Sequence, residues 1–248
     1  MEQTIAAIST STMSSGGISI VRISGENAIS VADTIFEAKN NKKLSKADSH
    51  TIHYGVIKDG DEVIDEVLVS VMKAPNTYTR EDVIEINCHG GILVTRKVLD
   101  TVLKNGARPA EPGEFTKRAF LNGRIDLSQA EAVIDIINAR NDYALKSSVN
   151  QLGGRLSEKI TAIREVLDNV AFIESALDDP EHFDINDNVD KMTKDVDNCV
   201  DKVDKLLKTS DNGRIMRDGI RTVILGKTNA GKSSLLNALA KEERAIQI

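Results

Sequence analysis

The chain has no tryptophan, only two cysteines, and aromatic residues make up only 3% of its 248 residues. Proteins that bind single-stranded nucleic acid by stacking need aromatic side chains, so the composition argues against such a platform. Cys88 and Cys199 lie far apart in the sequence and form neither a C-x-x-C motif nor a disulfide framework. We therefore expect two reduced thiols, as in a cytosolic protein.

Long apolar runs and an excess of positive charge are also missing. No apolar stretch approaches the ~18 residues that cross a bilayer, and the first residues lack the basic and apolar regions of a signal peptide. The net charge of −6 gives no general electrostatic attraction to nucleic acid or to membrane lipid. The composition predicts a cytoplasmic globular protein, long enough for about two domains, with no membrane partner.

A phosphate-binding loop is the clearest motif that the sequence does contain. Residues 226–233 fit the pattern G-x-x-x-x-G-K-[ST], between a β-branched run and an apolar helix pattern. The glycines let backbone N–H groups approach phosphate oxygens, Lys232 suits the β- and γ-phosphates, and Ser233 suits Mg²⁺. We expect a strand, a loop and a helix in that order. The alternative is a glycine turn that binds no ligand.

The position of this loop limits what the chain is expected to do. Few residues follow Ser233, and a nucleotide-hydrolysing domain also needs a Mg²⁺-binding aspartate, a water-positioning element and a base-reading loop. We therefore expect residues 216–248 to hold only the first strand, loop and helix of a truncated α/β G domain. The chain itself is expected to be inactive as a GTPase.

Residues 1–120 are predicted to form an α+β domain. Alternating apolar residues predict strands, and helical periodicity predicts two helices. The strands are expected at residues 5–8, 17–23, 50–58, 62–73 and 83–86, and the helices at 28–36 and 92–105. Asp59-Gly60 is a two-residue hairpin signal, and the polar, basic residues 40–48 predict an exposed connection.

Residues 121–215 are predicted to form an incomplete α-helical bundle domain. Ser128 and Glu131 fit a capping box for a long helix to about residue 152, where Gly153-Gly154 interrupts it before a second helix. Between residues 189 and 206 apolar residues step by three and four, which favours a helix packed in a bundle over a free coiled coil. Asn212-Gly213 is expected to end this last helix.

Four stretches of the chain resemble one protein family. They are residues 16–25, 78–91, 110–132 and 226–237, of which the third is the most specific. Together they resemble the MnmE/TrmE family of tRNA uridine-5-carboxymethylaminomethyl modification GTPases. The resemblance implies an N-terminal domain that binds 5-formyl-tetrahydrofolate and forms a homodimer, a helical domain, and a G domain that hydrolyses GTP with Mg²⁺ and K⁺. It also implies a flavin-dependent partner protein and the wobble uridine of certain tRNAs as the substrate.

The resemblance also implies two sets of site residues. Arg22, Glu85 and Arg124 correspond to the folate contacts, which is chemically reasonable because a carboxylate can pair with the amide-like edge of a pterin and an arginine can grip a carboxylate. A surface ion pair or a capping contact is the alternative for each. The implied GTP contacts are Asn229, Ala230, Gly231, Lys232, Ser233 and Ser234, with Ser233 as the Mg²⁺ ligand and Asn229 as the K⁺ ligand.

Three interpretations of the function stay open on the sequence. The chain is the N-terminal part of a tRNA-modification GTPase, or a folate-binding dimerisation module without nucleotide turnover, or a dimerisation scaffold with neither ligand. Cys88 and His89 suggest a nucleophile and a base, but neighbouring residues on a strand point to opposite faces. We therefore expect no catalytic residue in this chain.

Overall fold

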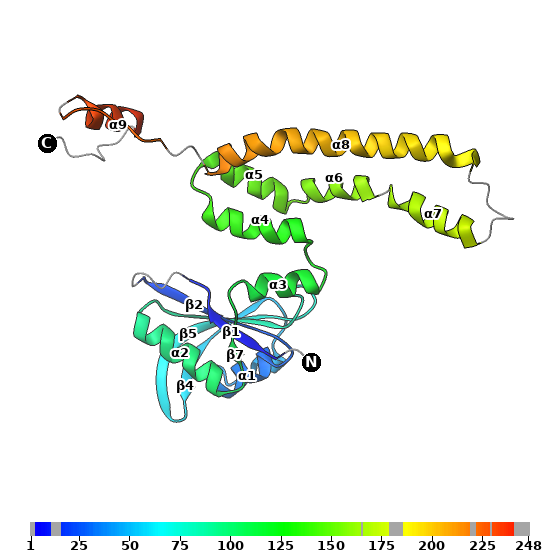
Figure 1. Ribbon diagram of the computed structural model, residues 1–248. Coiled ribbons are helices and arrows are strands. Elements are labelled where there is room, and N and C mark those ends of the chain that lie inside the picture. The colour runs from blue at the N-terminus through cyan, green and yellow to red at the C-terminus, as the bar shows by residue number, and fades with distance from the viewer. Residues whose placement is uncertain are drawn as a thin grey trace. The chain divides into compact units, whose positions relative to one another are not determined.

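The computed structural model describes residues 3–10, 16–164, 166–178, 186–218, 222–228 and 230–240. The described residues fall into two compact units (Figure 1). The first unit lies within Met1–Ile137 and Ser148–Ser157, and the second lies within Asn138–Ser147 and Glu158–Ile248. In the part of the chain that is described, no helix is both long and apolar enough to cross a membrane.

A seven-stranded mixed sheet with the order β3-β4-β5-β6-β2-β1-β7 is the base of the first unit. Its strands are β1 (Ile5–Ile8), β2 (Ile18–Ser24), β3 (Phe36–Ala38), β4 (Thr51–Asp59), β5 (Glu62–Met72), β6 (Val83–His89) and β7 (Arg108–Pro109). Only the short pairing of β1 with β7 is parallel. The five expected strands are confirmed, whereas β3 and β7 were not expected, because strands of two or three residues carry too little alternation to detect.

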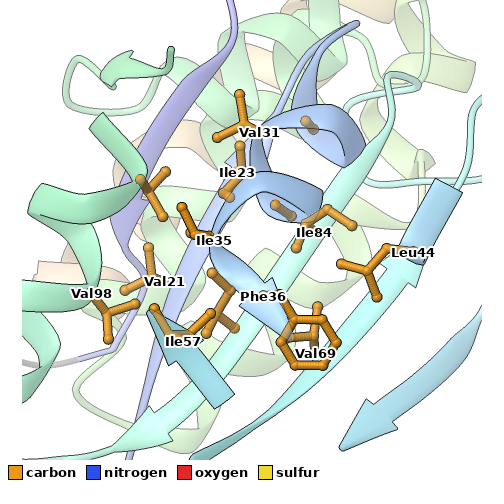
Figure 2. Close-up of a cluster of buried hydrophobic side chains, with 14 of the residues drawn as sticks. Val21, Ile23, Val31, Ile35, Phe36, Leu44, Ile57, Val69, Ile84 and Val98 are labelled. Atoms are coloured by element: carbon orange, nitrogen blue, oxygen red, sulfur yellow. The ribbon is translucent and has the colours of Figure 1, made fainter. Parts of the chain in front are cut away.

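Helices α1 (Ala28–Ile35) and α2 (Ile92–Lys104) pack on one face of this sheet. Alternate residues of the central strands point to these helices and form the buried core, which Figure 2 shows with Val21, Ile23, Val69, Ile84, Val31, Ile35 and Val98. Burying each such side chain contributes about 1.5–3 kcal/mol. Because side chains alternate along a strand, Arg22 and Glu85 lie on the opposite face of the sheet.

The hairpin between β4 and β5 forms as expected, with the turn shifted by one residue. Asp59 pairs with Glu62, so Gly60 and Asp61 make the turn. Gly60 has a φ of 63°, which is the left-handed conformation that the favoured hairpin turns require.

The expectation of an exposed connection over residues 40–48 is wrong at one residue. Leu44 begins a short 3₁₀ helix, η1 (Leu44–Lys46), and its side chain is fully buried in the core. The carboxylate of Asp33 accepts the backbone N–H groups of Leu44 and Ser45 at 2.6 and 3.1 Å. A single apolar residue among polar neighbours therefore anchors this segment, which composition alone does not reveal.

The helices after the sheet differ from the sequence pattern mainly in where they begin and end. They are α3 (Glu114–Leu121), α4 (Leu127–Asn138), α5 (Asp142–Leu152), α6 (Arg155–Arg164) and α7 (Leu167–Asp178), followed by α8 (Asn186–Asp218) and α9 (Lys232–Ala240). The single long helix expected over 128–152 is wrong, because Asn141 accepts the N–H of Ala144 at 2.8 Å and starts a new helix.

The capping box of α4 also differs from the expected one. The N–H of Gln129 donates to Asp126 Oδ1, and the N–H of Asp126 donates back to Gln129 Oε1, both at 2.9 Å. These reciprocal bonds define a capping box that starts two residues before the expected pair of Ser128 and Glu131. An aspartate is as good a cap as a serine, so the pattern alone did not decide between them.

In the second unit α8 packs against α6 and α7, in agreement with the bundle interpretation. Asn169 Nδ2 donates to Asp195 Oδ2 at 3.3 Å, and Cys199 Sγ lies 4.0 Å from the carbonyl oxygen of Ile163. The expected end of α8 at Asn212-Gly213 is wrong, because the helix continues to Asp218. One glycine costs a helix only about 1 kcal/mol and does not by itself end it.

The strand expected before the phosphate-binding loop does not form. Residues 222–227 have no regular structure, and the side chains of Val223 and Leu225 are 77% and 86% exposed. A strand is stable only when neighbouring strands satisfy its backbone and cover its side chains. Helix α9 does begin at Lys232, as the motif predicts.

Gly55 on β4 gives a direct test of the packing between the edge strands. A Cβ at this position would lie 2.2 Å from the carbonyl oxygen of Glu37 and 2.7 Å from the ring of Phe36. We expect Gly55→Ala to lower the free energy of unfolding by about 1–3 kcal/mol in urea denaturation, because a backbone oxygen cannot move aside freely. Gly17→Ala, where nothing lies within 4 Å, is the control. An equal loss in both variants would contradict this packing.

Candidate functional site

The first part of the candidate site is an ion pair on the sheet face opposite the core. Arg22 on β2 and Glu85 on β6 are direct cross-strand partners. Arg22 donates from Nε and from one terminal amino group to the same oxygen, Glu85 Oε1, at 2.8 and 2.7 Å. The two side chains are 28% and 21% exposed, so a ligand can reach them.

Tyr78 brings the third predicted folate contact to this pair. The guanidinium carbon of Arg22 lies 5.7 Å from the centre of the Tyr78 ring, and that of Arg124 lies 4.8 Å from it. The ring of Phe115 lies 5.6 Å from the guanidinium carbon of Arg22. These distances are in the range of cation–π interactions. The structure therefore brings two guanidinium groups to one aromatic ring: that of Arg22, which is bound to Glu85, and that of Arg124.

The two aromatic residues of this cluster did not emerge from the sequence as site residues. Tyr78 and Phe115 lie in two of the stretches that resemble the family, residues 78–91 and 110–132. Only 3% of the residues in the chain are aromatic. An aromatic residue inside one of those stretches is therefore a signal that could have identified Tyr78 and Phe115 as candidate site residues.

A cavity of about 440 Å³ adjoins Tyr78 and Arg124. Its remaining walls come mainly from aliphatic side chains of α4 and α5, together with one amide: Ile125, Gln129, Val133, Ile136, Ile137 and Leu152. Ligand pockets typically have this composition, with apolar walls and a few polar groups that fix the orientation. The cavity can therefore receive a ring or chain that extends past Tyr78.

A buried arginine supports the loop that carries Tyr78. The Arg118 side chain on α3 is only 2% exposed, and it donates to both oxygens of Glu81 at 2.9 and 3.1 Å. It also donates to the carbonyl oxygen of Gln3 at 2.7 Å and to Glu114 Oε1 at 3.1 Å. Its charge is thus compensated by two carboxylates, as a buried guanidinium requires.

Glu114 is strongly stabilised in its ionised form by the same network. Hydrogen bonds from Arg108, followed by those from the backbone of Glu111 and from Arg118, hold the pKa of Glu114 at about 2, although burial alone would raise it. Arg108 makes two of these bonds, to Oε2 at 2.9 Å and to Oε1 at 2.5 Å. Opposite charges and donated hydrogen bonds both favour the carboxylate.

The described part of the phosphate-binding loop lies at the start of α9. Gly231 has a φ of 78°, which suits glycine, and Lys232 Nζ donates to the carbonyl oxygen of Lys227 at 2.5 Å. Ala230 and Ser234 are exposed and Ser233 is half-buried. Asn229, the predicted K⁺ ligand, lies outside the described residues. The Lys232 side chain thus contacts the backbone of its own loop.

Cys88 and His89 point to opposite faces of the sheet, as expected. Cys88 is buried, which raises the pKa of its thiol, and its Sγ lies 3.4 Å from the carbonyl oxygen of Ser19. His89 Nδ1 lies 2.7 Å from Asp65 Oδ1 on the exposed side. Over the described ranges no group of three or more His, Cys, Asp or Glu side chains could hold a metal ion.

The low pKa of Glu114 predicts an acid-sensitive fold. The folded-state pKa of about 2 lies below the ordinary value of 4.5, so the stabilisation is present above pH 4.5 and is lost as the pH falls toward 2. We expect the melting temperature of the native chain, followed by circular dichroism, to fall more steeply over this range than that of Glu114→Gln. Glu111→Gln changes an exposed carboxylate three residues earlier in the chain, and its melting temperature should depend on pH as that of the native chain does. Parallel curves for Glu114→Gln and the native chain would contradict the assignment.

Two family models together match nearly the whole chain. The model described as the N-terminus of the GTP-binding protein TrmE matches residues 4–124, and the model of the MnmE helical domain matches residues 127–247. The first match contains Arg22, Glu85, Tyr78 and Arg124.

Curated relatives agree with these models. The tRNA modification GTPase MnmE of Lachnoclostridium phytofermentans is 59% identical over 98% of this chain and 53% of the relative. The proteins of the same name from Carboxydothermus hydrogenoformans and Bacillus subtilis are 55% and 54% identical, over 99% and 98% of this chain and 54% of each relative. The chain thus spans about half the length of the curated relatives it matches. It belongs to the MnmE/TrmE family of tRNA modification GTPases and corresponds to the N-terminal part of its members.

Proposed function

We propose that this chain binds 5-formyl-tetrahydrofolate through Arg22, Glu85 and Arg124, as part of a GTPase that modifies C5 of the wobble uridine in tRNA. The observation that supports the folate site is the convergence of these three residues on Tyr78. They come from β2, β6 and the connection between α3 and α4, which are far apart in the sequence. The names of the relatives support the tRNA-modifying GTPase.

Each of the three side chains has a distinct role in this proposal. Arg22 directs its Nε and one terminal nitrogen to Glu85 Oε1, which fixes the carboxylate and leaves Oε2 to accept N–H groups from the amino-pyrimidine edge of a pterin. Arg124 is exposed at the mouth of the 440 Å³ cavity, where it can donate to a carbonyl or a carboxylate of the ligand. The site then combines a hydrogen-bonding end and a charged end around one aromatic ring.

In the whole protein we propose that residues 229–234 bind GTP. Lys232 would hold the β- and γ-phosphates, Ser233 the Mg²⁺ ion and Asn229 the K⁺ ion. The proposed domains are residues 1–120 for folate binding and homodimerisation, 121–215 for the helical domain and 216–248 for the start of the G domain. We further propose a flavin-dependent partner protein and tRNA as the partners of the whole protein.

A folate-binding dimerisation module without nucleotide turnover is the second candidate for this chain alone. The observation that favours it is the exposure of apolar side chains around the loop, among them Val223, Leu225 and Leu239. A phosphate-binding loop needs a packed strand and helix to hold its N–H groups in place. Here Val223 and Leu225 are exposed, and α9 has no fully buried residue.

The folate site is tested by calorimetric titration with 5-formyl-tetrahydrofolate. We expect the native chain to bind and Arg22→Ala to bind at least about tenfold more weakly, because charge-assisted hydrogen bonds contribute roughly 1.5–3 kcal/mol. Arg96→Ala removes an exposed arginine from α2, on the other face of the sheet, and should bind as the native chain does. Equal affinity in the native chain and Arg22→Ala would reject the assignment of Arg22.

The second candidate predicts negligible GTP turnover by this chain. With Mg²⁺ and K⁺ present, phosphate release from GTP should stay at the rate of the Lys232→Ala variant, because the loop lacks a supporting core. The complete Bacillus subtilis relative, measured in parallel, provides the reference rate. Turnover by this chain at that reference rate would contradict the prediction.

A further inference from the structure

Tyr78 is held in place by more contacts than an exposed loop residue needs. Its hydroxyl lies 2.9 Å from Thr116 Oγ1 on α3, and the carbonyl oxygen of Thr79 accepts from Asn122 Nδ2 at 2.7 Å. Arg80 has a φ of 61°, a conformation that non-glycine residues rarely adopt, and its guanidinium donates to the carbonyl oxygen of Asn122 at 3.0 Å. Such strain persists only where the surroundings fix the backbone, and it is often found beside functional sites.

The buried Arg118 connects to this loop through a chain of hydrogen bonds. Arg118 holds Glu81, and the Ser24 hydroxyl donates to Glu81 Oε2 at 2.7 Å. Because the single Ser24 proton is used there, the hydroxyl of Thr79, 2.6 Å away, donates to Ser24. Thr79 directly follows Tyr78, so the guanidinium of Arg118 determines the position of the backbone that carries the ring.

Tyr78 is only half-buried, although its hydroxyl and the backbone next to it are hydrogen-bonded. One of its neighbours is Arg22, which is bound to Glu85, and another is Arg124 at the mouth of the cavity. A tyrosine that served only to tie the loop to α3 would be expected to bury its ring. Tyr78 instead forms part of the cavity wall, and its ring also lies 5.7 Å from the guanidinium carbon of Arg22, which is bound to Glu85.

We infer that Tyr78 is the aromatic wall against which the planar ring system of the ligand packs, and that Arg118 and Glu81 are the positioning residues that hold this wall. The inference rests on the proposed folate site and adds a specificity-determining residue to it. A pterin has the flat, polarisable ring that packs well against tyrosine. The Arg22–Glu85 pair would then contact the edge of the same ring, and the rest of the ligand would extend toward Arg124.

The composition of the chain makes Tyr78 directly observable. The chain has three tyrosines, Tyr54, Tyr78 and Tyr143, so a protein labelled with 3-fluorotyrosine gives three ¹⁹F signals. The signal missing from Tyr78→Phe belongs to Tyr78. On addition of 5-formyl-tetrahydrofolate we expect this signal to shift, whereas those of Tyr54 on β4 and Tyr143 on α5 serve as internal controls and stay in place.

Affinity for 5-formyl-tetrahydrofolate separates the ring from its hydroxyl group. We expect Tyr78→Leu to bind roughly tenfold more weakly than the native chain, because the stacking surface is lost. Tyr78→Phe keeps the ring and should stay within about threefold. A structural role limited to the Thr116 hydrogen bond would instead make Tyr78→Phe bind as weakly as Tyr78→Leu, because both variants lose the hydroxyl.

The positioning role is tested in the ligand-free protein. Arg118→Lys keeps the positive charge but loses the forked geometry, and Asn122→Ala is a milder second variant that removes one bond to the loop. In both we expect the Tyr78 signal to shift or broaden and the folate affinity to fall, in proportion to each other. Unchanged Tyr78 signals in folded variants would overturn the positioning role.

The outcomes separate this inference from the proposed function. If the native chain does not bind the folate, the proposed function fails and the inference fails with it. If the native chain binds while the Tyr78 signal does not move and Tyr78→Leu binds equally well, the folate site stands and the inference is wrong.

Discussion

A guanidinium buried away from water must have its charge and its donors satisfied within the protein, and Arg118 meets this requirement by connecting three segments. It contacts the N-terminal segment at the Gln3 carbonyl, the 77–82 loop at Glu81, and its own helix α3 at Glu114. Removal of one partner of such a network leaves an uncompensated buried charge, which costs about 3–5 kcal/mol. The arrangement of these segments, and with it the position of Tyr78, therefore depends on this one side chain.

The sheet supplies the second constraint on the site. The register between β2 and β6 places Arg22 opposite Glu85, with core residues on both sides of each in the sequence. A slip of one residue would exchange the two faces, burying Arg22 under α1 and α2 and exposing the core. The core that stabilises the fold thus also fixes the ion pair on the opposite face. In this unit, burial of the same apolar side chains both stabilises the fold and positions the Arg22–Glu85 pair.

The main elements of the fold were predictable from the sequence, because alternation and helical periodicity are local signals. The family-like stretches pointed to Arg22, Glu85 and Arg124, which the structure brings near one another, while their binding of folate stays a prediction. The breaks between helices were not, since Asn141 and Asp126 act as caps only through bonds that the pattern does not show. The strand before the phosphate-binding loop was predicted from β-branched residues, yet a strand also needs neighbours. Tyr78 and Arg118 were missed because their importance arises from contacts between residues up to 115 positions apart, as from Arg118 to Gln3.

We propose that Arg22, Glu85 and Arg124 form a single folate site around Tyr78. A crystal structure of the chain bound to 5-formyl-tetrahydrofolate tests it most directly. We expect the pterin ring to lie against Tyr78, with its edge hydrogen-bonded to Glu85 and the remainder of the ligand directed toward Arg124. Ligand density on any other surface, with the Arg22–Glu85 pair and Tyr78 uncovered, would contradict it.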